Sequence, residues 1–262
     1  MKIGFIGAGN MGGAIIGGIV KNCISNDVIV YDKSAEGLVK ISEKFGVKTA
    51  KDNIEVIKES DVIFFAVKPN VLYNVIDEIK DYVDEEKVIV SIVAGQSMEK
   101  IETAFEKNIK LIRVMPNTPA LVGEGMSALC KNVNVKDSDM QAVLNIFKGI
   151  GVAEEVSEYM MDAVTAVSGS SPAYVFMFIE AMADAAVMGG MPREKAYTFA
   201  AQAVIGSAKM VLETGKHPGE LKDMVCSPGG TTIEAVKVLE KEGFRSSVIE
   251  AMKACIDKSK SL

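Results

Sequence analysis

Residues 2–12 read KIGFIGAGNMG, a short apolar run that leads into three spaced glycines. A continuously apolar run of this length is typical of a buried strand in a parallel sheet, and the periodic segment from Asn10 predicts a helix. In this context Gly7 allows the tight turn and Gly9 lets a pyrophosphate approach the backbone, while Gly12 allows close packing of helix on strand. The stretch therefore predicts the first unit of a dinucleotide-binding fold.

The alternation of strand and helix continues through the first part of the chain. Helical periodicity over 35–45, over 71–82 and from residue 97 separates four apolar runs, VIVY, DVIFFAV, KVIVSIV and KLIRVM. Short strand–helix units predict an α/β fold with a doubly wound, Rossmann-type sheet. The stretch GMSALC, a helix after Asp137 and VAEEV complete this sheet. We place the dinucleotide-binding domain at residues 1–157.

The pattern changes after that point, because no clear strand follows. Helices are predicted over 158–167, 173–188 and 193–214, with two more that end near residue 260. The run AYVFMFIEAMADAAVMGG is apolar on nearly all sides, and such a helix needs partners all round. We therefore expect residues 158–262 to form an all-α dimerisation domain that packs against another copy.

Bulk composition limits the possible partners and locations. Of the 262 residues, 48% are hydrophobic and 24% charged, which indicates a globular protein, and the net charge of −6 argues against a nucleic-acid partner. The uncharged run 3–20 is too glycine-rich for a signal peptide or a membrane span, so we expect a cytoplasmic protein with no membrane partner. The four cysteines lack CxxC spacing and there is one histidine, so no metal site is predicted and reduced thiols are expected.

Three residues after the second strand bear on the choice of cofactor. Asp32 lies about twenty residues past the last glycine, where an acid accepts from the ribose 2′-hydroxyl and disfavours a 2′-phosphate. Lys33 and Ser34 are candidates to hold that phosphate instead, and a helix N-cap is the alternative role for Asp32. The pattern leaves NADH and NADPH open.

Two further segments lie where strands of the predicted sheet end. Residues 66–69, AVKP, follow one strand, and the proline there stops the strand and leaves carbonyls free toward a ribose. Lys68 either reaches the substrate or is a solvated strand end. The stiff loop MPNTP, with Asn117 at its centre, is predicted to line the nicotinamide pocket.

The second half of the chain has its own glycine-rich turn, Ser227-Pro228-Gly229-Gly230-Thr231-Thr232, which opens the helical run IEAVKVLE. The first amides of a helix are unsatisfied and lie at the positive end of the dipole, so this turn is a candidate anion site. A plain helix N-cap is the alternative. His217 precedes another helix start and is interpreted as structural, and a reactive role for Cys226 is a minor alternative to a structural thiol.

The whole chain resembles the pyrroline-5-carboxylate reductase family. The segments that carry the resemblance come in the family's order and spacing: FIGAGNMGGAI, SDVIFFAVKP, VMPNTPALVGEG, SGSSPAYVFMFIEAMADAA and HPGELKDMVCSPGGTTIEAVKVLE. The resemblance implies reduction of L-1-pyrroline-5-carboxylate to L-proline by hydride from NADPH or NADH, the final step of proline biosynthesis. It also implies a homodimer with interlocked helical domains, assembled in some members into a decamer of five dimers.

The resemblance extends to individual positions. It implies substrate contacts at Ser227, Gly230, Thr231 and Thr232, with Thr232 as the catalytic residue beside the ring nitrogen. Together with the patterns above, the predicted cofactor-binding residues are Gly7, Ala8, Gly9, Asn10, Met11, Gly12, Asp32, Lys33, Ser34, Asn53, Ala66, Val67, Lys68, Pro69, Ala94 and Asn117. Two positions depart from the family: Asp32, where members often lack an acid, and Gly215, where some carry a glutamate that faces the substrate.

Three other functions remain as alternatives. A β-hydroxyacid dehydrogenase needs a base, usually a lysine in a helix of the second domain, and SGSSPAYVFMFIEAMADAA has none, which leaves Lys209 or Lys222 as stand-ins. A different imine reductase is the second alternative. A non-catalytic protein that binds NAD(P)H is the third, although such a protein has no need of a second anion site.

Overall fold

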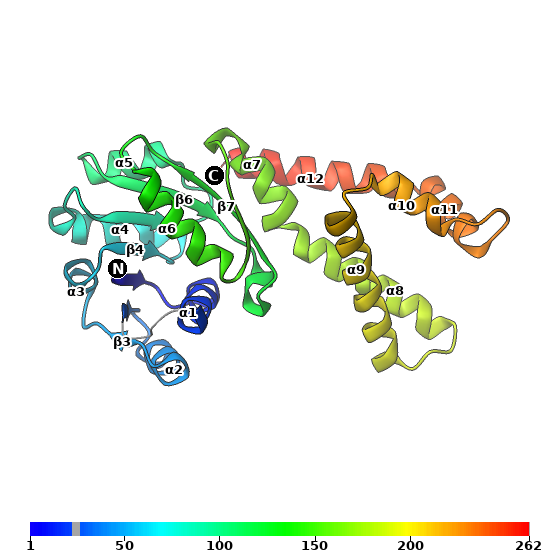
Figure 1. Ribbon diagram of the computed structural model, residues 1–262, viewed down its shortest axis with the longest axis horizontal. Helices are drawn as coiled ribbons and strands as arrows, with labels where there is room; N and C mark the ends of the chain where they lie inside the picture. Colours follow the sequence, from blue (N-terminus) through cyan, green and yellow to red (C-terminus); the bar gives the residue numbers. More distant parts are fainter. Residues whose placement is uncertain (23–26, 262) are drawn as a thin grey trace. The chain divides into compact units, whose positions relative to one another are not determined.

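The computed structural model describes residues 1–22 and 27–261, and Cys23 lies outside the described residues (Figure 1). The chain divides into two compact units. The N-terminal unit contains Met1–Ser170 and the chain from Ile256 onward, and the helical unit contains Ser171–Cys255.

The N-terminal unit is built on an eight-stranded sheet with the strand order β3-β2-β1-β4-β5-β6-β7-β8. The strands are β1 Ile3–Ile6, β2 Val28–Tyr31, β3 Lys48–Thr49, β4 Val62–Phe65, β5 Val88–Ser91, β6 Lys110–Met115, β7 Gly125–Lys131 and β8 Gly151–Glu155. The strands β1 to β6 pair in parallel, which confirms the doubly wound fold. β7 is antiparallel to β6 and parallel to β8, so the last two strands run the other way, because a short connection joins antiparallel neighbours.

Helices cover both faces of this sheet. α1 (Asn10–Asn22), α2 (Ala35–Phe45) and α6 (Asp137–Lys148) pack on one face, and α3 (Asn53–Glu59), α4 (Pro69–Ile79) and α5 (Met98–Phe105) on the other. In β4, Phe64 joins the first of these two cores and Phe65 the second. Burial on both faces is the reason that the central strands β1, β2 and β4 are apolar along their whole length.

The segment between α2 and β4 contains two elements that the sequence analysis did not predict. β3 has two residues and both are exposed, so it has no apolar pattern. α3 has a cap signal: the Asp52 carboxylate accepts the N–H of Glu55 at 2.7 Å, and the Glu55 carboxylate accepts the N–H of Lys51 at 2.8 Å. Such reciprocal capping marks a helix start in sequence, so α3 was predictable.

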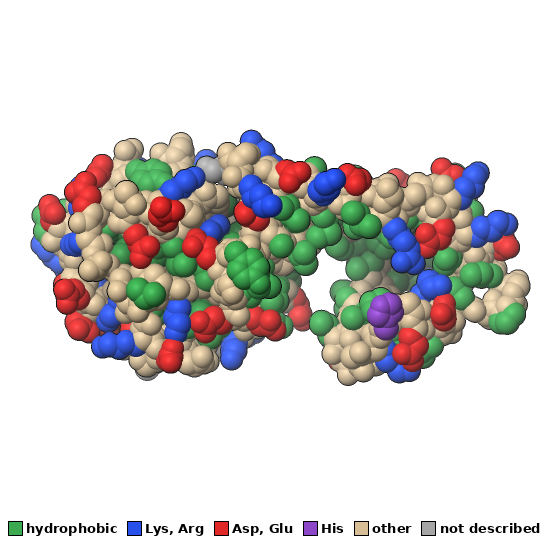
Figure 2. Space-filling view, turned by 90° about the horizontal axis from the view of Figure 1, so that it is seen from above, with side chains coloured by type: hydrophobic (Ala, Val, Ile, Leu, Met, Phe, Trp, Pro, Cys, Tyr) green, Lys and Arg blue, Asp and Glu red, His purple; other side chains and the backbone are tan. Residues whose placement is uncertain are grey.

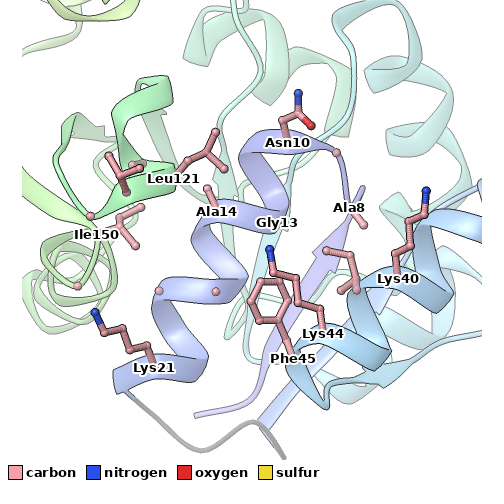
Figure 3. A pocket seen from close by; sticks show the side chains of 18 of the residues that line it. Ala8, Asn10, Gly13, Ala14, Lys21, Lys40, Lys44, Phe45, Leu121 and Ile150 are labelled. Carbon is pink, nitrogen blue, oxygen red and sulfur yellow. The ribbon is translucent and has the colours of Figure 1, made fainter. Parts of the chain in front are cut away.

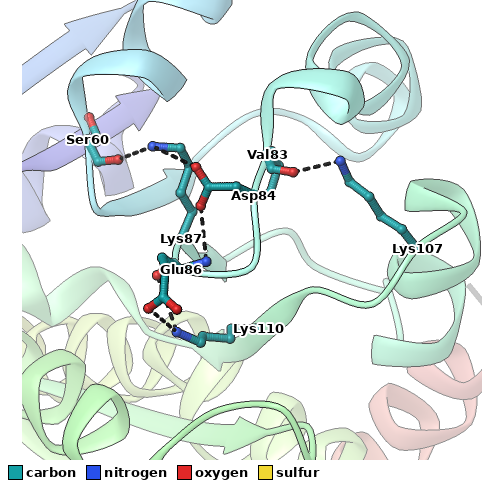
Figure 4. Close-up of polar contacts among 7 residues, drawn as sticks. All are labelled: Ser60, Val83, Asp84, Glu86, Lys87, Lys107 and Lys110. Carbon is teal, nitrogen blue, oxygen red and sulfur yellow. Dashed lines mark hydrogen bonds and ion pairs between the residues drawn. The ribbon is translucent and has the colours of Figure 1, made fainter.

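Lysine side chains bind the loops that precede β4 and β5 (Figure 4). Lys87 Nζ donates to the carbonyl of Ser60 at 3.0 Å, and Lys107 Nζ donates to the carbonyl of Val83 at 2.6 Å (Figure 4). Lys110 Nζ pairs with Glu86 at 3.5 Å. These contacts lie at the amino ends of the strands, away from the carboxyl ends, where ligands bind in doubly wound sheets.

The predicted helix over 158–167 is wrong as a single element. The structure has a 3-10 turn at Glu158–Met160, one helical turn α7 at Met161–Val164, and a π-helical turn η5 at Thr165–Gly169. Hydroxyl groups compete with the backbone here, since Thr165 Oγ1 donates to the carbonyl of Met161 at 2.8 Å and Ser168 Oγ to that of Val164 at 3.1 Å.

The helical unit contains α8 (Ser171–Met188), α9 (Arg193–Thr214), α10 (Pro218–Val225), α11 (Thr231–Lys241) and most of α12 (Phe244–Lys260). The prediction of two helices after residue 214 is wrong, because Gly243, at φ +74°, separates α11 from α12. Many apolar side chains of the unit are exposed, including Phe176 (63%) and Leu212 (80%), and Figure 2 shows apolar side chains at its surface. By length and composition alone, one described helical stretch, Glu158–Met188, is long and apolar enough to span a membrane.

Candidate active site

The glycine loop between β1 and α1 has the geometry that its spacing predicts. Gly7 has φ +102°, and a Cβ there would lie 2.5 Å from the carbonyl oxygen of Ala66. A Cβ on Gly12 would lie 2.8 Å from the carbonyl oxygen of Gly7, so α1 begins in close contact with the loop. A Cβ on Gly9 would meet no atom within 4 Å. The loop is closely packed at Gly7 and Gly12. It is open at Gly9, where the pyrophosphate of a ligand needs space to approach the protein backbone.

A pocket of about 250 Å³ lies beside this loop, at the carboxyl ends of β1, β2 and β4. Strand order reverses at β1, and this is the place where doubly wound sheets bind their ligands. The pocket brings together eight of the predicted cofactor residues: Gly7, Gly9, Asp32, Lys33, Asn53, Ala66, Val67 and Lys68. Its other lining residues, which the sequence analysis missed, are Ile6, Tyr31, Val71 and Val75. Val71 and Val75 lie one turn apart on α4, and this spacing could have predicted that they share one face of the helix.

Asp32 is held by two backbone amides. Its Oδ2 accepts the N–H of Ala8, in the glycine loop, at 2.7 Å, and its Oδ1 accepts the N–H of Ser34 at 2.8 Å. The N-cap of α2 is Ser34, whose Oγ accepts the N–H of Gly37 at 3.1 Å. The alternative in which Asp32 caps the helix is therefore wrong, and its carboxylate instead joins the end of β2 to the glycine loop.

Asn53 is the first residue of α3 and is 3% exposed. Its Nδ2 donates to Glu78 Oε2 at 2.7 Å, and its Oδ1 is buried with no hydrogen-bond partner among the described residues. A buried carbonyl oxygen without a partner is costly, so its place in the wall of the pocket favours a ligand nearby. Glu78, which fixes this amide, carried no signal in the sequence.

Other predicted cofactor residues lie outside this pocket. Ala8 and Asn10 line a second hollow along the outer face of α1, with Lys21 of α1 and Lys40 and Lys44 of α2 around it (Figure 3). Six predicted residues line neither hollow: Met11, Gly12, Ser34, Pro69, Ala94 and Asn117.

Asn117 lies in the loop after β6, and both ends of its side chain are engaged. Nδ2 donates to the carbonyl of Ser168 at 3.0 Å, and Oδ1 accepts the N–H of Met126 at 2.9 Å. The side chain is 8% exposed. These bonds make the loop rigid, as its two prolines predict, and they give Asn117 a structural role.

In the helical unit, the turn over 227–230 opens α11 without a side-chain cap. The N–H of Gly230 donates to the carbonyl of Ser227 at 3.0 Å, and Gly229 has φ +68°. Gly230 is the N-cap, so Thr231 and Thr232 are the first two helical residues. The turn is thus a helix N-cap, as the alternative interpretation has it, but Gly230 offers no side chain to the first amides of the helix. The free amides and the positive end of the dipole suit an anion.

Two other polar groups have structural roles. His217 Nδ1 accepts the N–H of Gly219 at 3.0 Å and caps α10, which confirms the structural interpretation. Burial, and then the nearby charge of Glu158, raise the pKa of the Cys130 thiol to about 12. Cys226 is a free thiol. In the described part of the chain, no three His, Cys, Asp or Glu side chains gather as a metal site.

Comparison with known proteins gives matches over both parts of the chain. Residues 158–262 match the family model for pyrroline-5-carboxylate reductase dimerisation, and residues 2–95 match that of coenzyme F420-dependent NADP oxidoreductases. The chain is 54% identical to the pyrroline-5-carboxylate reductase of Escherichia coli, over all of this chain and 98% of the relative. It is 44% identical to that of Methanosarcina acetivorans, over all of this chain and 97% of the relative.

Solved structures agree with these relatives. The reductase of Coxiella burnetii superposes with a TM-score of 0.93 at 35% identity, over 99% of this chain and 97% of that one. The Plasmodium falciparum enzyme, solved with NADP bound, gives 0.91 at 36% identity, over 100% and 97%. Identity of 54% over nearly the full length of the relative, together with the glycine loop and the uncapped start of α11, shows that the protein belongs to the pyrroline-5-carboxylate reductase family.

Proposed function

We propose that this protein reduces L-1-pyrroline-5-carboxylate to L-proline with a hydride from NADH or NADPH, as the final step of proline biosynthesis. The observation that carries the proposal is the uncapped start of α11, an anion-accepting helix end in addition to the open glycine loop. The loop suits the pyrophosphate of a dinucleotide, and α11 suits the carboxylate of a small acidic substrate.

The cofactor is bound by the N-terminal unit in this proposal. The ribose next to the adenine enters the pocket lined by Asp32 and Asn53, and the pyrophosphate lies over Gly9. The remaining contacts are the other residues of the predicted set: Gly7, Ala8, Asn10, Met11, Gly12, Lys33, Ser34, Ala66, Val67, Lys68, Pro69, Ala94 and Asn117. When bound, the reduced nicotinamide supplies the hydride.

The substrate is bound by the turn before α11. The carboxylate accepts hydrogen bonds from the first amides of the helix, with Ser227, Gly230 and Thr231 around it. Thr232 is the second helical residue, and its hydroxyl makes no hydrogen bond among the described residues, so it is available to the ring nitrogen. The protonated imine is already electrophilic, so orientation and electrostatics suffice and no strong general acid is needed.

Assembly uses the helical part of the chain. The match of residues 158–262 to a dimerisation family and the exposed apolar side chains of α8 support a homo-oligomer. We propose a homodimer through residues 158–262, with residues 1–157 as the dinucleotide-binding domain and further assembly into a decamer of five dimers. The exposed apolar stretch Glu158–Met188 then serves this interface, not a membrane. Cys130 and Cys226 are free thiols, which supports a location in the cytoplasm.

A spectrophotometric assay tests the reaction. Purified protein is mixed with L-1-pyrroline-5-carboxylate and either NADH or NADPH, and the loss of nicotinamide absorbance is followed. The Thr232→Ala variant is expected to lower kcat/KM by about tenfold or more, because a hydrogen bond to the reacting nitrogen is lost. Thr103→Ala is a matched control, because Thr103 is an exposed residue of α5.

The outcomes separate the alternatives. Unchanged kcat and KM in Thr232→Ala would show that Thr232 has no role at the ring nitrogen. Turnover on β-hydroxyacids in place of the imine would favour the dehydrogenase. Cofactor binding without turnover on any of these substrates would favour a non-catalytic NAD(P)H-binding protein.

A further inference from the structure

The carboxylate of Asp32 binds a backbone amide at the start of α2. The first amides of a helix are the usual binding groups for a phosphate. Here Asp32 Oδ1 accepts the N–H of Ser34 at 2.8 Å, and Ser34 Oγ accepts the N–H of Gly37 at 3.1 Å. Two donors that would serve a phosphate beside α2 are thus occupied by side chains of the same segment.

The same carboxylate is fixed toward the pocket from its other side. Asp32 Oδ2 accepts the N–H of Ala8 at 2.7 Å, so two amides from two loops set the orientation of the carboxylate. Asp32 lines the pocket of about 250 Å³ together with Gly7 and Gly9. A carboxylate accepts about four hydrogen bonds, so capacity remains for the hydroxyl groups of a ligand.

The neighbouring groups do not offset this negative charge. The Asn53 amide, on the same pocket, has its Nδ2 engaged with Glu78 Oε2 at 2.7 Å. Two lysines, Lys33 and Lys68, also line this pocket, but both are exposed, and a solvated lysine is a mobile point charge. The pocket therefore presents one fixed acceptor, the Asp32 carboxylate, and two mobile donors, Lys33 and Lys68.

We propose that Asp32 occupies the place of a 2′-phosphate and makes this reductase select NADH over NADPH. The 2′-hydroxyl and 3′-hydroxyl of an unphosphorylated ribose donate to Asp32, whereas a 2′-phosphate meets a carboxylate that cannot turn away. This inference rests on the proposed function only in naming the cofactor of that reaction, since it concerns binding and not turnover.

Binding without the imine substrate is the direct test. NADH and NADPH are titrated separately into the purified protein, and nicotinamide fluorescence gives each Kd. We expect the Kd of NADPH to be about tenfold higher or more, because like charges in contact are unfavourable. Equal affinities, or tighter binding of NADPH, would overturn the inference.

Two variants separate the charge of Asp32 from general effects. Asp32→Asn keeps the size of the side chain and is expected to bring the two Kd values to within about threefold of each other. Asp61→Asn is the matched control, since Asp61 Oδ2 also accepts a backbone amide, from Lys2 at 2.8 Å, at the opposite edge of the sheet. A ratio that is unchanged in Asp32→Asn, or equally changed in Asp61→Asn, contradicts the proposal.

A pair of nucleotides tests the same point if Asp32→Asn fails to fold. Adenosine 5′-monophosphate and adenosine 2′,5′-bisphosphate differ only in the 2′-phosphate, and each is used to displace NADH from the unsubstituted protein. The monophosphate is expected to be the stronger competitor, and the reverse order would overturn the proposal. Selective NADH binding with no turnover on the imine would leave this inference standing and refute the proposed reaction.

Discussion

Asn117 and Ser168 are joined by a hydrogen bond of 3.0 Å, in which the side-chain amide donates to a carbonyl of the π-helical turn η5. The same side chain accepts the N–H of Met126 at 2.9 Å, so one buried amide connects the loop after β6, the start of β7 and η5. The Ser168 carbonyl that accepts this bond lies in η5, where the α-helical hydrogen-bond pattern is interrupted. A single residue thus orders the stiff loop that the sequence predicts beside the nicotinamide.

Replacement of Asn117 is expected to reduce stability. Asn117→Ala leaves the Met126 N–H and the Ser168 carbonyl without this partner, and we expect a loss of about 2 kcal/mol in the free energy of unfolding. Urea denaturation measures the loss. Asn74→Ala, an exposed change on α4, is the control and is expected to be near neutral. An Asn117→Ala variant that is as stable as the wild type but binds cofactor weakly would show that Asn117 serves as a cofactor contact and does not stabilise the loop.

Gly9 and Gly12 form a matched pair with opposite expected effects. In Gly9→Ala the new methyl group meets no protein atom within 4 Å, so the melting temperature should stay unchanged, whereas NADH should bind about tenfold or more weakly because the methyl group lies where the pyrophosphate approaches. In Gly12→Ala the Cβ would lie 2.8 Å from the Gly7 carbonyl oxygen, so the melting temperature itself should fall. Scanning calorimetry and cofactor titration on both variants check the contrast. Normal cofactor binding by Gly9→Ala would show that the pyrophosphate does not bind next to Gly9.

Sequence periodicity predicted most of the fold because most elements bury an apolar face. The runs of β1, β2, β4, β5 and β6 and the helix Ala35–Phe45 were found from that pattern alone. β3 was missed because it is short and exposed, and the reversed direction of β7 and β8 depends on a connection that periodicity does not describe. The break of the helix after Glu158 depends on contacts such as Asn117 with Ser168, which join residues far apart in sequence.

The candidate site was predictable to a similar degree. Glycine spacing identified the loop, and the residues of the pocket at β1 follow from the topology of the sheet. The amide partners of Asp32 and the bond from Asn53 to Glu78 were not predictable, because local pattern does not report how side chains pair across elements. The hydrogen bonds of Asp32 decide that its carboxylate is fixed at the pocket and does not cap α2.

The buried thiol of Cys130 gives a prediction about alkaline pH. Its pKa is about 12 in the folded protein, against 9.0 for an ordinary cysteine thiol, so the folded state keeps the proton over the pH interval in which the unfolded chain releases it. Stability is therefore unaffected below about pH 9 and falls as the pH rises above it, by about 1 kcal/mol at pH 10 from this thiol. Urea denaturation at about pH 8 and pH 10 should show a smaller loss for Cys130→Ala than for the wild type. Identical pH dependence in the two proteins would show that the thiol is not desolvated.

Association through α8 is tested by a charge placed on its exposed apolar surface. Phe176 is 63% exposed in the single chain, and a second copy would have to cover it if α8 is in the interface. We expect Phe176→Glu to weaken the dimer by about tenfold or more, because an unpaired charge would be buried on association. Val133→Glu is the control, since Val133 is 99% exposed in the N-terminal unit and lies outside the proposed dimerisation domain. Light scattering across a dilution series measures both. A Phe176→Glu protein that stays as associated as the control would place the interface elsewhere on residues 158–262.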